Sequence, residues 1–117
     1  MWFSDKEKAA INRIAKAMIF VDENVAAEEI VTSVLFCKKY GIDAEMGDII
    51  DPDEALNVIA ALSSEEKEMV CAYLGTLMAI DGEVDSRELL YWNLLSFRCG
   101  FPEMNVPQAV MYFNSHI

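Results

Sequence analysis

Two matching stretches of sequence decide how this chain is organised. Residues 21–30 read VDENVAAEEI, and residues 80–89, which begin 59 positions later, read IDGEVDSREL. Both follow the pattern Asp-x-x-Val-x-x-x-Glu, and both continue with an apolar residue. A repeat of this period indicates a duplicated structural unit. We therefore predict two halves, residues 4–62 and 63–117, which a pseudo-twofold axis relates in space.

The spacing of apolar and capping residues predicts helices along the whole chain. Serine, aspartate or asparagine precedes glutamate or glutamine by three positions at several points, which is typical of helix starts. No segment alternates polar and apolar residues as a half-buried strand does. The predicted helices span residues 5–21, 27–40, 51–62, 63–80 and 85–100, with a short one from residue 105. We therefore predict a single all-α domain over residues 1–117, a compact helical bundle of two pseudo-symmetric three-helix halves.

Composition limits the classes of function. The chain has 117 residues, 54% of them hydrophobic, and a formal net charge of −11. Such hydrophobicity supports a buried core and excludes a disordered chain, while the acidic charge argues against binding nucleic acid. With one histidine and no glycine-rich phosphate loop, no small-molecule substrate is evident. Paired carboxylates could serve a hydrolase, but no nucleophile or oxyanion device accompanies them, so we expect a protein that is not an enzyme.

The cysteines and the apolar runs bear on the surroundings of the protein. Cys37, Cys71 and Cys99 form no Cys-x-x-Cys pair, so we expect buried free thiols rather than disulfides or a zinc site. The N-terminus lacks the pattern of a signal peptide. The longest weakly polar run, residues 69–80, is shorter than the roughly 20 residues that span a bilayer. We therefore expect no membrane insertion and a cytoplasmic location.

Four carboxylates in the repeated stretches are candidate metal ligands: Asp22, Glu29, Asp81 and Glu88. Each aspartate follows a predicted helix, where the helix dipole disfavours a negative charge. Glu29 follows an alanine at the capping position, so capping does not fully explain it. One interpretation is a structural turn in which each aspartate accepts N–H groups from the next helix. The other is a shared Ca²⁺ or Mg²⁺ site, formed if the pseudo-twofold axis brings the two turns together.

An EF-hand does not explain the second acidic turn. Asp81, Glu83 and Asp85 stand at the first, third and fifth positions of such a loop. The sixth position, however, is Ser86 instead of glycine, and the twelfth is Trp92 instead of glutamate. The sharp turn and the bidentate ligand of an EF-hand are therefore both missing.

Residues 77–89, LMAIDGEVDSREL, resemble the signature of the tellurite-resistance TerB-like family. That signature contains Asp-Gly-x-[Val/Ile]-x-x-x-Glu between two helices. The N-terminal domain of a membrane-anchored J-domain co-chaperone, which is similar to this family, carries the same turn. The resemblance implies a compact bundle of two pseudo-symmetric halves, a stress-response or envelope-associated role, and binding of a divalent metal by the four carboxylates named above. The first half departs from the signature, because Glu23 replaces the glycine and Ala26 the polar cap.

A second class of function, an interaction or scaffold module without metal, rests on two other features. Between Lys39 and Lys67 there are eight acidic residues and no basic one, which forms either a solvated connector or a surface for a basic partner. The predicted helix over residues 85–100 is apolar almost all round, so it is either central or lies at a contact, and a core position is the default. If its Trp92 or Tyr91 faced outward, we would expect a protein partner or a homodimer.

Overall fold

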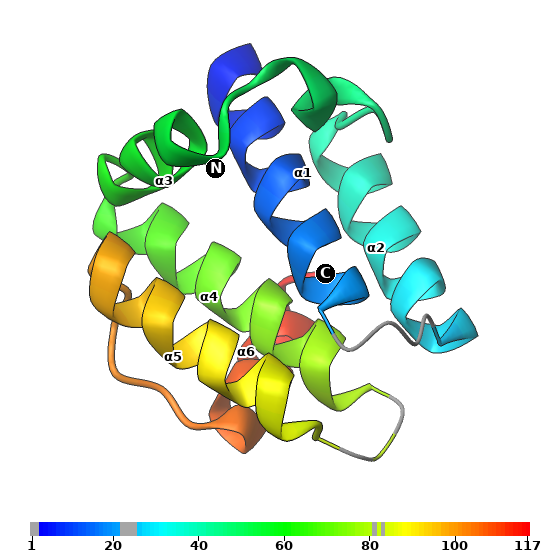
Figure 1. Cartoon of the computed structure of the whole chain (residues 1–117). Helices are drawn as coiled ribbons and strands as arrows, with labels where there is room; N and C mark the ends of the chain where they lie inside the picture. Colours follow the sequence, from blue (N-terminus) through cyan, green and yellow to red (C-terminus); the bar gives the residue numbers. More distant parts are fainter. Residues whose placement is uncertain (1–2, 22–25, 81, 83) are drawn as a thin grey trace.

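The computed structural model describes residues 3–21, 26–80, 82 and 84–117 (Figure 1). Within these residues the regular structure is entirely helical. The helices are α1 (Asp5–Phe20), α2 (Ala27–Tyr40), the 3₁₀ helix η1 (Met46–Ile49), α3 (Pro52–Ala60), α4 (Ser64–Ala79), α5 (Ser86–Cys99) and α6 (Val106–His116). The prediction of a compact all-α fold is confirmed, and the bundle measures 32 × 27 × 26 Å. The twofold relation of the halves in space stays a prediction.

Local sequence signals place the helix ends. Ser4 and Ser63 each accept a hydrogen bond at 3.2 Å from the N–H of the glutamate three residues later. Those glutamates return a hydrogen bond to the serine N–H, so both capping boxes are complete. Gly41 and Gly100 end α2 and α5 with φ angles of 68° and 70°, a left-handed conformation that favours glycine. As a result, α1 and α4 begin and end 59 positions apart, and so do α2 and α5.

The centre of the molecule is α4. Its residues 69–78 are all buried, and it packs against α1, α2, α5 and α6. Aromatic rings from three helices meet on one side of it. Phe36 of α2 stacks on Tyr73 of α4 with ring centroids 3.9 Å apart, and Phe113 of α6 lies 6.0 Å from Tyr73. This stack ties the first half of the chain to the second.

The prediction that the helix α5 lies in the core is wrong, because α5 is buried on one side only. It does bury Trp92, which is 3% exposed and donates its indole N–H to the Cys71 carbonyl oxygen at 3.2 Å. On its outer side, however, Leu90, Leu94 and Phe97 are exposed. The physical reason is that α4 fills the centre, so that α5 lies on the outside of the bundle, in contact with α1, α3 and α4.

The acidic connector is more structured than its charge suggests. It contains η1, which packs against α1 and which the sequence did not predict. The N–H of Gly47 donates to Asn12 Oδ1 at 2.9 Å, and a Cβ atom at Gly47 would lie 2.5 Å from the Arg13 backbone nitrogen. Close backbone contact therefore anchors the connector, while its acidic side chains face solvent.

None of the described helices has the length and apolar character needed to cross a membrane.

Candidate functional site

Two of the four predicted metal ligands lie in the described residues, and both are buried. Glu29 is in the first turn of α2 and Glu88 is in the first turn of α5, and each is 2% exposed. Asp22 and Asp81 lie outside the described residues. In Figure 1, α2 begins at the right of the view and α5 begins near the bottom. The structure therefore places the two glutamates at matching positions of the repeat.

Part of the role of Glu29 is capping. Its Oε1 atom accepts a hydrogen bond from the N–H of Ala26 at 3.4 Å, although the alanine offers no side-chain acceptor in return. In the second half, Asp85 caps α5 and accepts the N–H of Arg87 at 2.7 Å. Hydrogen bonds from the side chain and backbone of Arg87 lower the pKa of the Asp85 carboxyl. Asp85 is thus an ionised helix cap at neutral pH.

Among the residues that the structure describes, no three histidine, cysteine, aspartate or glutamate side chains gather closely enough to hold a metal ion. A cation at either acidic turn would need Asp22 or Asp81 in addition to the buried glutamate. Carboxylate oxygens are the ligands that Ca²⁺ and Mg²⁺ prefer, so the chemistry of these residues fits such an ion.

The three cysteines are free in the structure. Cys71 and Cys99 are buried, and burial raises the pKa of the Cys71 thiol to about 12. Cys37 is half-buried and lies on the side of α2 that faces α1. The expectation of free thiols is confirmed, and that of burial holds fully for Cys71 and Cys99.

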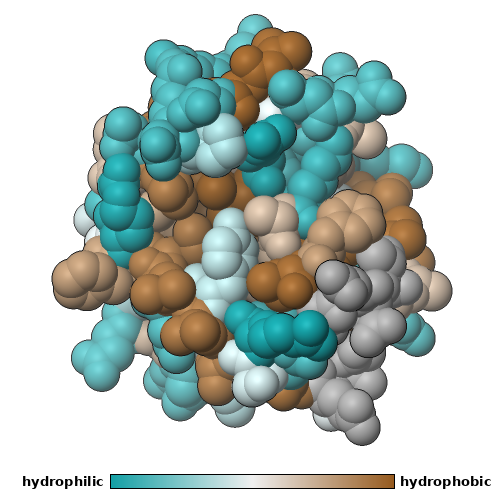
Figure 2. Space-filling model, viewed as in Figure 1, coloured by the Kyte–Doolittle hydropathy of each residue, from teal (hydrophilic) through white to brown (hydrophobic). Residues whose placement is uncertain are grey.

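The outer face of α5 is the most apolar exposed helix surface in the second half. Leu90, Leu94 and Phe97, which follow each other at helical spacing, are 60%, 58% and 90% exposed. Figure 2 shows apolar side chains over the part of the molecule in which α5 lies. The exposed charges of this helix are those of Arg87 and Arg98, since its one carboxylate, that of Glu88, is buried.

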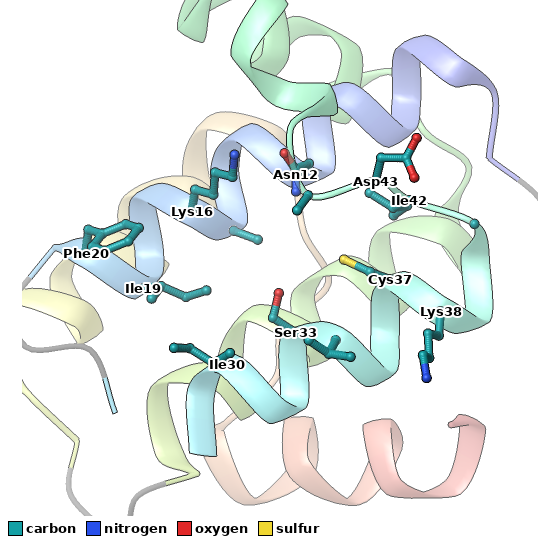
Figure 3. Close-up of a pocket in the computed structure, with 14 residues that line it drawn as sticks. Asn12, Lys16, Ile19, Phe20, Ile30, Ser33, Cys37, Lys38, Ile42 and Asp43 are labelled. Carbon is teal, nitrogen blue, oxygen red and sulfur yellow. The ribbon is translucent and has the colours of Figure 1, made fainter. Parts of the chain in front are cut away.

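A groove of about 600 Å³ lies between α1 and α2 (Figure 3). Both helices pack against α4 but make little contact with each other, which leaves the space between them open. The walls are mostly apolar, and the connector after α2 closes one end. The lining residues include Asn12, Lys16, Ile19, Ile30, Ser33 and Cys37.

A few polar groups face this groove. Lys16 Nζ forms an ion pair with the exposed Asp48 at 3.0 Å. Ser33 Oγ accepts a hydrogen bond from the Tyr73 hydroxyl at 3.1 Å. Burial raises the pKa of the Cys37 thiol, while a hydrogen bond with Ser33 and the charge of Lys16 act in the opposite direction. The Lys16 ammonium group therefore influences both walls of the groove.

Sequence reasoning did not find this groove. Its lining residues come from two helices and a connector, and no local motif marks them. A comparison of the two halves offers one signal for the groove. Ser33 stands 59 positions before Trp92, so the first half has a small polar residue where the second half has a large one.

Comparison with known proteins gives a match among solved structures. No family model and no curated protein matches the chain. A solved structure of a protein of unknown function from Porphyromonas gingivalis W83 matches with a TM-score of 0.83 and 34% sequence identity. The match covers 98% of this chain and 98% of that chain. The similarity thus extends over the helical fold as a whole.

Proposed function

We propose that this chain, which belongs to the same family as that protein of unknown function, is an interaction module in which α5 binds a second copy. The proposal is carried by one observation, the exposed row of Leu90, Leu94 and Phe97 on α5. These three side chains form an exposed apolar row at helical spacing, so a partner that covers the row would remove apolar surface from water.

Charge supports a second copy as the partner. Each chain has a net charge of −11, so two copies repel each other over most of their surfaces. The face of α5 is an exception, because it exposes no carboxylate and its exposed charges are arginines. Arg87 is already paired with Asp85 at 3.3 Å. Two antiparallel α5 helices can therefore meet with Leu94 near the centre and Leu90 opposite the partner's Phe97.

The expected dimer is weak. One helix of 14 residues from each copy forms a contact at the small end of specific interfaces. We expect a dissociation constant on the order of micromolar or weaker, and sedimentation equilibrium over a range of protein concentrations measures it. A protein that remains monomeric at the highest concentrations would overturn the proposal.

The variant L94E/F97E tests the surface. Two glutamates at the centre of the contact place like charges opposite each other, so we expect the dimer to be lost. The fold should be retained, because both positions are exposed and surface substitutions typically change stability by less than about 0.5 kcal/mol. The matched control is V31E/L35E, which changes two exposed apolar residues of α2, the counterparts of Leu90 and Leu94. Loss of the dimer in the control, with retention in L94E/F97E, would assign the contact to α2 instead.

Binding of Ca²⁺ or Mg²⁺ is the second candidate function, favoured by the two glutamates of the acidic turns. Glu29 and Glu88 are buried at matching positions of the two turns, and their carboxylate oxygens are of the kind that Ca²⁺ and Mg²⁺ prefer. The resemblance to the TerB-like family supports the same candidate, as a metal-binding domain of a stress-response or envelope-associated system. Asp22 and Asp81 would supply the remaining carboxylates.

A thermal melt after EDTA treatment tests this candidate. A cation that binds only the folded protein stabilises it by about 2.7 kcal/mol at 100 times its dissociation constant. The gain should disappear in E29Q/E88Q, which keeps the shape of both side chains and removes their charge. The control E28Q changes an exposed neighbour in the first turn of α2 and should keep the gain. The absence of any gain with Ca²⁺ or Mg²⁺ in the unaltered protein would exclude the cation site.

A further inference from the structure

A cleft of about 680 Å³ lies where the connector after α2 crosses the start of α1. In Figure 1 this connector runs from the end of α2 across the top of α1 to α3. We call the space the connector cleft, and its lining includes Asp5, Lys6, Asp43, Met46, Ile49 and Glu54. None of the residues that line it belongs to α5, so the cleft is separate from the surface to which we assign self-association.

The second half of the chain lacks the element that forms the outer wall of this cleft. Asp51, the cap of α3, stands ten positions after Gly41, whereas Asn105, the cap of α6, stands five positions after Gly100. The longer connector forms η1, while residues 101–105, all of which the structure describes, form no helix. The cleft is therefore a feature of the first half that the repeated unit does not share.

The helix η1 presents apolar side chains on a fixed backbone. The hydrogen bond from the Gly47 N–H to Asn12 Oδ1 at 2.9 Å holds η1 against α1. Ile49 is 90% exposed, and Met46, which lines the same cleft, is only partly buried. An apolar side chain that packs against these two residues removes apolar surface from water. Because the backbone of η1 is already held in place, such a contact requires little further ordering.

The surface around the cleft is negatively charged. Residues 43–54 contain six carboxylates and no basic group, and all six acidic residues are exposed. Figure 2 shows mostly hydrophilic residues at the top of the view, where the connector lies. Lysines of α1 neutralise two of the carboxylates, in the pairs Lys6–Glu54 at 2.7 Å and Lys16–Asp48 at 3.0 Å. The excess charge attracts a cationic partner and repels nucleic acid or a second copy, whose net charge is −11.

The carboxylates are spread around the cleft. Asp5 comes from α1 and Asp43 from the connector, and neither takes part in an ion pair among the described residues. Lys8, whose Nζ atom would lie 3.5 Å from a Cβ atom at Gly41, pairs with neither of them. In the described part of the chain no three carboxylate, thiol or imidazole groups lie close enough together to hold a metal ion. A ligand with several separated positive charges therefore suits the cleft better than a single ion.

We propose that the connector cleft binds a segment of a partner protein in which an apolar side chain stands between lysine or arginine residues. The apolar side chain packs against Ile49 and Met46, and the flanking basic side chains contact Asp5 and Asp43. Exposed ion pairs are individually weak, so the apolar contact is needed for specific binding. This site goes beyond the proposed function and does not depend on self-association through α5.

Nitrogen-15 NMR titration of the unaltered protein with the acetylated and amidated peptide GKRLRKG tests the proposal. We expect saturable shifts of the backbone amide signals of residues 5–9 and 43–50, which include the walls of the cleft. The peptide GKRGRKG has the same charge but no apolar side chain, and it should bind about fivefold more weakly. Equal affinity of the two peptides, or shifts confined to other parts of the chain, overturns the proposal.

A change at Ile49 tests the apolar contact. Ile49→Ser should weaken binding of GKRLRKG about fivefold and leave binding of GKRGRKG unaffected. The fold should be retained, because the side chain is almost fully exposed. The matched control Val31→Ser changes an exposed apolar residue outside the cleft and should alter neither affinity. A variant Ile49→Ser that binds GKRLRKG as tightly as the unaltered protein would overturn the assignment of the apolar contact.

Removal of two carboxylates tests the ionic contacts. D5N/D43N should weaken binding of both peptides about fivefold, whereas the control E28Q/E103Q removes two exposed carboxylates outside the cleft and should weaken it less than about twofold. Equal losses in the two variants would mean that only the overall charge attracts the peptide, which overturns the proposal. Tighter binding of spermine, a polyamine without an apolar side chain, than of GKRLRKG would overturn the assignment of a peptide.

Discussion

Gly75 offers a sharp test of how the second half packs. A Cβ atom at this position would lie 2.7 Å from the Cβ atom of Ala109 on α6 and 3.0 Å from Trp92 Cζ2. Both distances are shorter than ordinary van der Waals contacts, and neither neighbour is the end of a flexible side chain. Gly75→Ala must therefore move α6 or the indole of Trp92.

Two opposing effects set the magnitude. Alanine is favoured over glycine inside a helix by about 1 kcal/mol. An extra methyl group in a closely packed core costs typically about 1–3 kcal/mol. Because the methyl group meets two neighbours at once, we place the cost near its upper end and expect a net loss of about 1–2 kcal/mol. For a chain of 117 residues, a loss of 1 kcal/mol lowers Tm by about 4 °C.

Urea unfolding measures this loss, with the Gly75→Ala/Ala109→Gly double variant as the control. Removing the Ala109 methyl group should relieve the contact, so the double variant should be about 1 kcal/mol more stable than the two single changes predict together. A Gly75→Ala protein as stable as the unaltered one would refute the reasoning. It would mean that α6 and Trp92 yield without cost, and that Gly75 is not what allows the indole to fill this space.

Three further predictions follow from buried groups. Asn12→Ala removes the acceptor of the Gly47 N–H and should lower the free energy of unfolding by about 1–3 kcal/mol. Urea unfolding measures this loss, and a loss below about 0.5 kcal/mol would contradict an anchoring role of Asn12. Burial raises the pKa of Tyr91 to about 12, so the folded protein keeps a proton that the unfolded chain releases near pH 10. The free energy of unfolding should therefore fall as pH rises above about 10, and it should fall less steeply in Tyr91→Phe. Urea midpoints measured against pH test this, and equal slopes in the two proteins would contradict the role of Tyr91. N-ethylmaleimide should modify Cys37 in the folded protein more slowly than it modifies an exposed thiol, and it should modify Cys71 only after unfolding. Mass spectrometry of the labelled peptides measures both rates. Labelling of Cys71 before unfolding would contradict its burial.

The local parts of this fold could be predicted because local interactions produce them. The capping boxes at Ser4 and Ser63 depend on residues three positions apart, and the glycines after α2 and α5 on a single backbone conformation. The acidic turns were identified in the same way, and the structure adds that Glu29 and Glu88 are buried. Burial depends on neighbours that are distant in sequence, so no local pattern predicts it.

The sequence by itself determined the order of the helices, their ends and the duplication of the unit, because capping and apolar periodicity act over a few residues. Tertiary structure decided that α4 rather than α5 is central, because only one helix can occupy the middle of the bundle and contact α1, α2, α5 and α6. It also decided that Trp92 is buried against α4, while the space between α1 and α2 is open. The indole of Trp92 packs closely against Gly75, and such packing depends on the distance between helices rather than on the pattern within one helix.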